Sequence, residues 1–229
     1  MESLETILNK YTQDFAPVMP YNINRERVWL INLSESNEEI AKLNNTQKLD
    51  AYIQKQIKVN NYKTAIGGYG EDRVIYRNNN VFDGPDQEAR SIHLGIDIWD
   101  AAGTPIHSPL AGRIHSFADN AVPGDYGPTI IVEHELENHT FYLLYGHLSK
   151  TSLEGKYIGK TIKKGEQIAT LGAFEENVHW PPHLHFQIIK DLQGKQGDYP
   201  GVAKPSEKDF YLNNCPNPNL VLNLSILNK

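Results

Sequence analysis

WPPHLHFQII, residues Trp180–Ile189, is the stretch that most strongly determines how this chain is expected to fold. Its two prolines stop the preceding structure and favour an extended conformation. In a strand, side chains two residues apart point to the same face, about 6.6 Å apart along the chain. His183 and His185 are therefore expected to face one site, while Leu184 and Phe186 face the core. That separation is long for two adjacent ligands of one tetrahedral ion, and it suits one metal ligand beside one group that transfers protons.

The overall composition is that of an ordinary globular protein. Its 229 residues suffice for a full core, and 39% of them are hydrophobic while 22% are charged. The net charge of −6, without a long basic run, disfavours binding to nucleic acid or to an anionic membrane. No apolar run reaches the roughly 18 residues that a membrane span requires.

The N-terminus and the cysteine content bear on location. Residues 1–18 contain Glu2 and Glu5 and no continuous apolar run, so they are not expected to act as an export signal. A cytoplasmic location is the default expectation, and an exported one applies if a signal has been removed. Cys215 is the single cysteine, which excludes an intramolecular disulfide and a cysteine-based zinc cluster. We expect it to be a packed, unreactive thiol.

Residues 71–195 are predicted to form a mainly β domain, an antiparallel sandwich or barrel. Short β-branched and aromatic runs alternate there with Gly, Pro, Asn and Asp turns, and the polar turn at Asn138 predicts a hairpin. Residues 196–229 are predicted to be a C-terminal extension docked on this domain, with the apolar Leu220–Ile226 segment as an edge strand. The clearest strand candidates are Thr129–Glu133, Thr140–Tyr145, Ile158–Ile162 and Gln167–Leu171.

Residues 1–70 are predicted to be a small, partly helical N-terminal extension. Ser36 and Glu39 form a capping-box pattern, and apolar residues follow at helical spacing as far as about Val59. Asn44 and Asn45 weaken the middle of this pattern, so a break in the helix is expected there.

Three histidine motifs supply candidate site residues. His93 precedes Asp97 by four residues, and Gly95 between them allows the bend that would bring imidazole and carboxylate together. His147 ends an apolar and aromatic run directly after Gly146. With the two histidines of WPPHLHFQII, the chain offers four histidines and one carboxylate for a single site.

Two histidines and one carboxylate with an open fourth position are typical of a catalytic zinc site. The same ligand set forms the facial triad of non-haem iron enzymes, which would leave the other two histidines without a role. The zinc interpretation uses them, because a hydrolase needs groups that transfer protons and stabilise developing charge. A third alternative is a domain of this kind that binds or regulates without catalysis, and loss of a ligand would be its signature.

HLGIDIWDAAGTPIHSPLAGRI, YGHLS and PPHLHFQ, which span about residues 90–190, resemble the lysostaphin-type zinc metallopeptidases. Many members of that family cleave peptide cross-links of bacterial peptidoglycan. The resemblance implies an antiparallel β-sandwich with an active-site groove and one zinc ion (Zn2+) per chain. It assigns His93, Asp97 and His185 as zinc ligands, and His147 and His183 as catalytic groups that do not bind the metal.

This resemblance implies an endopeptidase that acts on a peptide or a peptidoglycan-like substrate. The sequence AFEENVHWPP stands where the family has a Gly-, Ser- or Thr-rich approach to HxH, which puts the substrate preference in question. On this assignment, Asp97→Ala is expected to lose metal with little effect on the fold. His147→Ala is expected to keep metal and lose most turnover.

Overall fold

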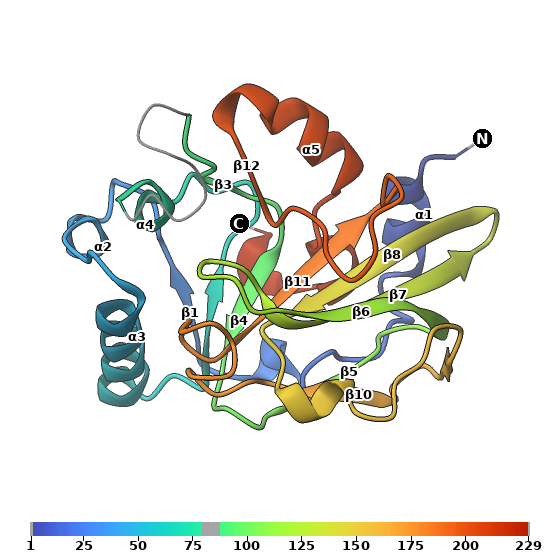
Figure 1. The fold of residues 1–229 in the computed structure, drawn as a ribbon, viewed down its shortest axis with the longest axis horizontal. Coiled ribbons are helices and arrows are strands. Elements are labelled where there is room, and N and C mark those ends of the chain that lie inside the picture. Colours follow the sequence, from blue (N-terminus) through green and yellow to red (C-terminus); the bar gives the residue numbers. More distant parts are fainter. Residues whose placement is uncertain (1, 79–87, 229) are drawn as a thin grey trace.

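Strands form the centre of the computed structural model, which describes residues 2–78 and 88–228 (Figure 1). They are β1 (Val28–Ile31), β2 (Thr64–Gly67), β3 (Ile92–His93), β4 (Ile96–Trp99), β5 (Pro105–His107), β6 (Gly112–Asn120), β7 (Gly127–Leu136), β8 (His139–Gly146), β9 (Thr161–Ile162), β10 (Gln167–Thr170), β11 (His183–Ile189) and β12 (Val202–Ala203).

Eight of these strands make one large sheet in the order β1-β2-β4-β11-β8-β7-β6-β9. Neighbouring strands are antiparallel, apart from β1 and β2, which are parallel. The pairs β5–β10 and β3–β12 form two small antiparallel sheets. The antiparallel pairing expected for a sandwich or barrel is confirmed, and it takes the form of one large sheet with two small ones.

Helices lie at both ends of the chain, so the fold is mixed α/β and the predicted mainly β class is too narrow. The α-helices are α1 (Leu4–Tyr11), α2 (Glu38–Ala41), α3 (Thr46–Asn60), α4 (Val74–Asn78), α5 (Lys208–Asn214) and α6 (Asn219–Leu222). Single 3-10 turns are η1 (Ile23–Arg25), η2 (Lys150–Leu153), η3 (Pro205–Glu207) and η4 (Ser225–Leu227). Within the described ranges, no helix combines the length and apolar character that crossing a bilayer demands.

The N-terminal helices follow the predicted pattern with one correction. α2 and α3 are separate, as Asn44 and Asn45 indicated, and the Asn45 side chain caps α3. Asn37, rather than Ser36, is the N-cap of α2, because its side-chain oxygen accepts from the Ile40 N–H. Residues 1–70 also supply β1 and β2 to the large sheet, where β2 pairs with β4.

The hairpin predicted around Asn138 is present between β7 and β8. Leu136 pairs with His139, so Glu137 and Asn138 form a two-residue turn. Glu137 has φ of 52°, the left-handed backbone that such tight turns use.

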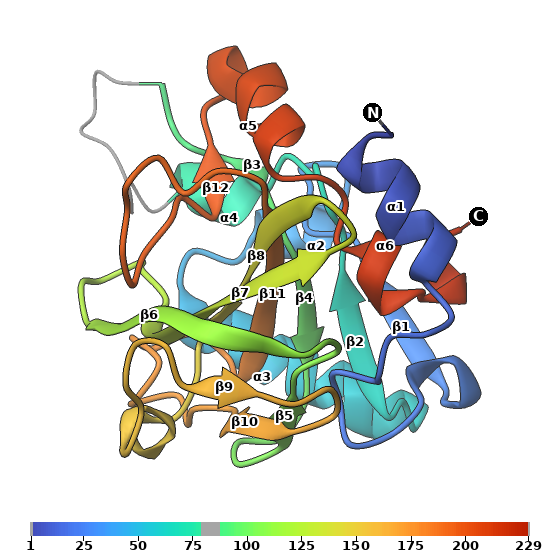
Figure 2. The same cartoon turned by 90° about the vertical axis from the view of Figure 1, so that its right-hand side faces the viewer.

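The C-terminal segment Leu220–Ile226 is not an edge strand as predicted, but forms α6 and η4. Asn223, with φ of 50°, ends α6 in a left-handed conformation. Val221 and Leu224 are buried in the main core, so helical turns satisfy the apolar pattern. α6 packs against α1, which brings the two ends of the chain together (Figure 2).

The two faces of the large sheet have different roles. One face carries Leu184, Phe186 and Ile188 of β11 and packs on the main core with residues of β5 and β10. The opposite face carries the histidines of β11. On that face α3 packs beside β1, β2 and β4, so the N-terminal segment flanks the strands that hold the histidines (Figure 1).

Candidate active site

A row of residues across the large sheet forms the centre of the site. In the strand register, Asp97 of β4 lies opposite His185 of β11. Gly67 of β2 lies on the other side of Asp97, and Gly146 of β8 lies on the other side of His185. Paired residues of neighbouring strands point to the same face, so the register places the carboxylate beside the imidazole.

The two glycines of this row leave spaces that other side chains occupy. A Cβ atom at Gly67 would lie 2.7 Å from Arg73 Nη2, and one at Gly146 would lie 2.7 Å from Tyr126 Cδ1. Arg73 comes from the segment between β2 and α4, and Tyr126 from the loop before β7. Any larger residue in place of either glycine would displace the side chain that fills its space.

His93, at the end of β3, adds a third acceptor atom to Asp97 and His185. His93 Nε2 lies 3.0 Å from His185 Nδ1 and 3.2 Å from Asp97 Oδ1. His185 Nδ1 lies 3.1 Å from the same carboxylate oxygen. Ligand atoms about 2.05 Å from a tetrahedral ion are about 3.3 Å apart, so these three atoms fit the ligand shell of one zinc ion.

Hydrogen bonds on the outer side of both rings fix which nitrogen faces this cluster. His93 Nδ1 donates to the Gly68 carbonyl over 2.9 Å. His185 Nε2 donates to Gln187 Oε1 over 2.8 Å, and Gln187 is held in that orientation because its Nε2 donates to the Pro200 carbonyl. In neutral rings, Nε2 of the first and Nδ1 of the second therefore carry lone pairs. Three lone-pair atoms without a proton between them repel one another, and a cation removes that repulsion.

Electrostatics in this buried cluster favour the protonation states that metal ligands need. Burial alone would raise the pKa of Asp97, but His93 and Arg73 hold it well below its ordinary value. Burial and the nearby Arg73 lower the pKa of His93 to about 4. At neutral pH the carboxylate is therefore ionised and the His93 imidazole is neutral.

His147 follows β8 and lies beside the three-ligand cluster without joining it. Its φ of 60° is left-handed, and two backbone hydrogen bonds of 3.0 Å, to Tyr126 and from Gly172, hold this conformation. Its ring centroid lies 4.0 Å from that of His183. Burial and the neighbouring His183 lower the pKa of His147 well below its ordinary value, so it is neutral at pH 7.

His183, the first histidine of HxH, points to the same face as His185 but at the edge of the cluster. Its Nδ1 donates to the Pro181 carbonyl over 2.6 Å, which leaves Nε2 as the lone-pair atom, 3.9 Å from Asp97 Oδ1. The ring stacks on Trp99, with centroids 5.3 Å apart. Burial lowers its pKa, so it too is neutral at pH 7.

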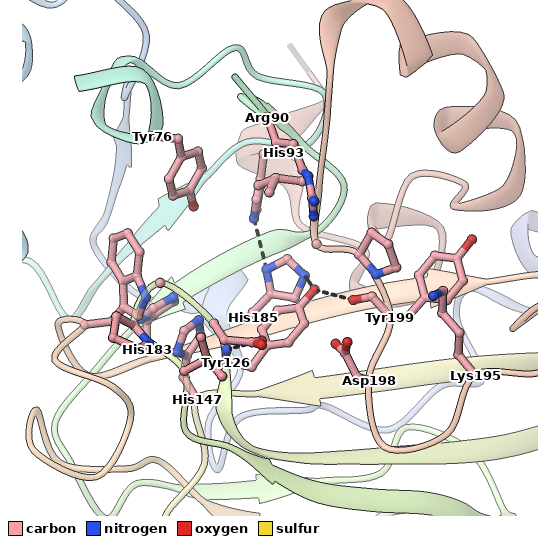
Figure 3. Close-up of a pocket in the computed structure, with 18 residues that line it drawn as sticks. Tyr76, Arg90, His93, Tyr126, His147, His183, His185, Lys195, Asp198 and Tyr199 are labelled. Atoms are coloured by element: carbon pink, nitrogen blue, oxygen red, sulfur yellow. Dashed lines mark hydrogen bonds between the residues drawn. The ribbon is translucent and has the colours of Figure 1, made fainter. Parts of the chain in front are cut away.

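The four histidines line a cavity of about 330 Å3. Figure 3 shows His147 and His183 on one side of His185, with His93 above it and Asp198 and Lys195 toward the other end. Tyr126 and Trp180 line the same cavity, as groove walls would. His179 is exposed and is not among the lining residues.

Two residues next to this cluster were not found from the sequence. Gln187 is completely buried and continues the period-two pattern of His183 and His185, so the alternation itself could have identified it. Arg73 forms an ion pair with Asp97 from 24 positions earlier in the chain, and no local pattern marks it. Cys215 is buried against Gln187 and burial raises its pKa to about 12, which confirms the expected packed thiol.

Comparison with known proteins identifies one family. Residues 91–198 match the family described as Peptidase family M23. No curated protein matches the chain.

Several solved structures are similar to parts of this chain. A zinc-containing peptidase from Vibrio cholerae is 27% identical over 48% of this chain and 31% of its own length, with a TM-score of 0.35. The catalytic domain of the antimicrobial peptidase lysostaphin from Staphylococcus simulans is 22% identical over 74% of this chain and 98% of its own, with a TM-score of 0.43. A putative peptidase M23 from Pseudomonas aeruginosa is 24% identical over 57% of this chain and 43% of its own length, with a TM-score of 0.38. The similarity to the Vibrio cholerae peptidase therefore spans about a third of the length of that protein.

Proposed function

The chain belongs to peptidase family M23 through its residues 91–198, and from this premise we propose that it is a zinc-dependent endopeptidase. The observation that carries the proposal is the convergence of His93 Nε2, Asp97 Oδ1 and His185 Nδ1, whose mutual distances are 3.0–3.2 Å. These three residues are the proposed zinc ligands, and His147 and His183 are the proposed catalytic groups.

The side chains present are suited to amide hydrolysis beside such an ion. A zinc ion held by three protein ligands supplies a Lewis acid with an open fourth position, which can acidify a water and polarise a carbonyl. His183 commits Nδ1 to the Pro181 carbonyl, so its Nε2 is available as the proton acceptor. The His147 ring, whose centroid lies 4.0 Å from that of His183, can donate a hydrogen bond to the oxygen where negative charge develops, and the proton that His183 accepts can pass to the leaving amine.

The proposed substrate is a peptide, with peptidoglycan peptides as the class to test first. The lining of the cavity has charged groups of both signs, among them Lys195 and Asp198. Val122 on its rim is 63% exposed and gives an apolar contact. This lining suits a substrate with both polar and apolar groups next to the scissile amide.

Metal content is the test of this proposal. Purified wild type, exposed to zinc and freed of excess metal, should contain about one zinc per chain by elemental mass spectrometry, as a single three-ligand site requires. His185→Ala should contain little. His134→Gln is the matched control, because His134 is a buried histidine of the same sheet outside the cluster, and it should bind zinc like wild type.

The same samples distinguish the alternatives. Hydrolysis of a peptidoglycan peptide panel that depends on bound zinc supports the proposal. Selective retention of iron in place of zinc would favour the facial-triad alternative. Stoichiometric zinc without hydrolysis of any peptide would favour a binding or regulatory module, and a folded wild type that binds no zinc contradicts the metal site itself.

A further inference from the structure

Arg73 is a completely buried cation that contacts the candidate metal site from outside the matched family region. Its side chain is 1% exposed, and Nη1 forms a hydrogen-bonded ion pair with Asp97 Oδ2. Nε donates to Glu71 Oε2 over 3.0 Å, and Nη1 also donates to the Tyr76 hydroxyl over 3.1 Å. An arginine buried this deeply must be balanced by nearby charge, and the carboxylates of Asp97 and Glu71 provide it.

The backbone is built to bring Arg73 to this position. Its N–H donates to the Ser91 carbonyl over 2.9 Å, and it forms a β-bridge with Ser34. Gly67, which pairs with Asp97 in the sheet, leaves the space that the guanidinium fills. The N-terminal part of the chain therefore supplies a residue that touches the proposed zinc ligand.

The two oxygens of Asp97 have separate partners. Oδ2 faces Arg73, whereas Oδ1 lies 3.2 Å from His93 Nε2 and 3.1 Å from His185 Nδ1. The guanidinium thus occupies one oxygen and turns the other toward the two imidazoles. Because Arg73 neutralises the carboxylate, the ligand arrangement can form in a buried site before any metal binds.

We propose that Arg73 is a positioning residue that preforms the metal site by directing Asp97 through Oδ1, and that the repulsion between its positive charge and the metal outweighs the gain from this preformation, so that the net affinity for the metal is lower. This inference rests on the proposed zinc site. Arg73 and a divalent cation share the same carboxylate, so each reduces what the other gains from it. When Arg73 is removed, the metal becomes the remaining cation next to Asp97, and folding depends more strongly on metal.

The test compares Arg73→Met with Arg73→Lys in the full chain. Zinc affinity is measured by competition with a chromophoric chelator, and thermal unfolding is followed with zinc and with EDTA. Arg73→Met should bind zinc about tenfold more tightly than wild type, and zinc should raise its unfolding temperature by more than it raises that of wild type. Arg73→Lys keeps the charge and should restore the wild-type affinity.

Arg113→Met is the matched control, because Arg113 pairs with Glu133 on the surface and is 57% exposed. It should leave both the zinc affinity and the zinc-dependent shift at wild-type values. An arginine with only a structural role would lower the unfolding temperature equally with and without zinc. That result, or a loss of zinc affinity in Arg73→Met, would overturn the inference.

Folding failure does not leave the inference untested. If Arg73→Met folds only with zinc, the metal has replaced the lost cation, as proposed. If it folds under neither condition, Arg73→Lys decides: a wild-type zinc affinity supports the role of charge, and a tenfold weaker one rejects it. A wild type that binds no zinc would instead contradict the proposed function, so the two failures are distinct.

Discussion

Two buried histidines on the large sheet, His134 on β7 and His185 on β11, differ in what surrounds them. His134 is 0% exposed and His185 is 3% exposed. Nδ1 of His134 donates to the Ala111 carbonyl over 2.9 Å, and its ring stacks on Phe141. Nδ1 of His185, in contrast, faces two other acceptor atoms, whereas His134 belongs to no comparable ligand group in the described part of the chain.

This difference shows that neither burial nor a shifted pKa identifies the site. Burial lowers the pKa of His134 to about 4, and burial with Arg73 lowers that of His93 to about 4 as well. What separates the two regions is that the lone pairs of His93, Asp97 and His185 converge without a shared proton. A group that fits a metal is recognised by this convergence and by the outer hydrogen bonds that impose it.

The largest expected effect is that of Asp97→Ala, which removes a proposed ligand and the partner of Arg73 together. We expect loss of stoichiometric zinc. Because a completely buried arginine then lacks its main counter-charge, the unfolding free energy of the zinc-free protein should also fall by about 3–5 kcal/mol. The little-changed fold expected from the sequence is therefore revised. Urea unfolding in EDTA, with metal analysis of the same samples, measures both effects.

The double variant Asp97→Ala/Arg73→Met separates the ion pair from general damage. If the lost stability comes from an unpaired arginine, the double variant should be more stable than Asp97→Ala alone, although still without zinc. If the stability lost in the double variant equals the sum of the losses in the two single variants, Asp97 and Arg73 are not coupled in this way. His134→Gln serves again as the control that keeps zinc.

Local sequence patterns predicted the parts of the fold and of the candidate site that depend on local geometry. The period-two alternation of HLHFQII fixed which side chains face the core, and the break at Asn44 and Asn45 separated two helices. Gly95 was expected to allow a bend between His93 and Asp97, and those residues do fall in separate strands, β3 and β4. These features follow from the chemistry of a few adjacent residues.

What the sequence did not predict depends on contacts between distant segments. Arg73 reaches Asp97 because β2 pairs with β4, and no spacing rule contains that pairing. The burial of His134 depends on such a contact too, because its Nδ1 donates to the carbonyl of Ala111, directly before β6, and Gly112 leaves room for its ring. α1 is a helix of only eight residues, too short to give a clear helical periodicity.

A smaller effect is expected for His147→Ala, which tests the difference between ligands and proton-transfer groups within the site. The ring centroid of His147 lies 4.0 Å from that of His183, and His147 is not a member of the group formed by His93, Asp97 and His185. Zinc content should stay at the wild-type level, while kcat on a cleaved peptide falls by about 10²–10⁴-fold, the usual effect of losing a general acid or base. Loss of zinc would instead make His147 a ligand, and unchanged turnover would remove it from the mechanism.

The smallest effect is that of His134→Gln, on the pH dependence of stability. The pKa of His134 is about 4 in the folded protein against 6.5 for an ordinary histidine, because burial disfavours its charged form. The unfolded chain therefore takes up a proton at a higher pH than the folded one. The stability that is present above pH 6.5 is lost as the pH falls from 6.5 to about 4. This shift corresponds to about 3 kcal/mol.

In EDTA, the loss of unfolding free energy between pH 7 and pH 4 should be smaller in His134→Gln than in wild type by about that amount. Equal losses in the two proteins would mean that His134 is protonated as readily in the folded state as in the unfolded one, and that its burial has no electrostatic consequence.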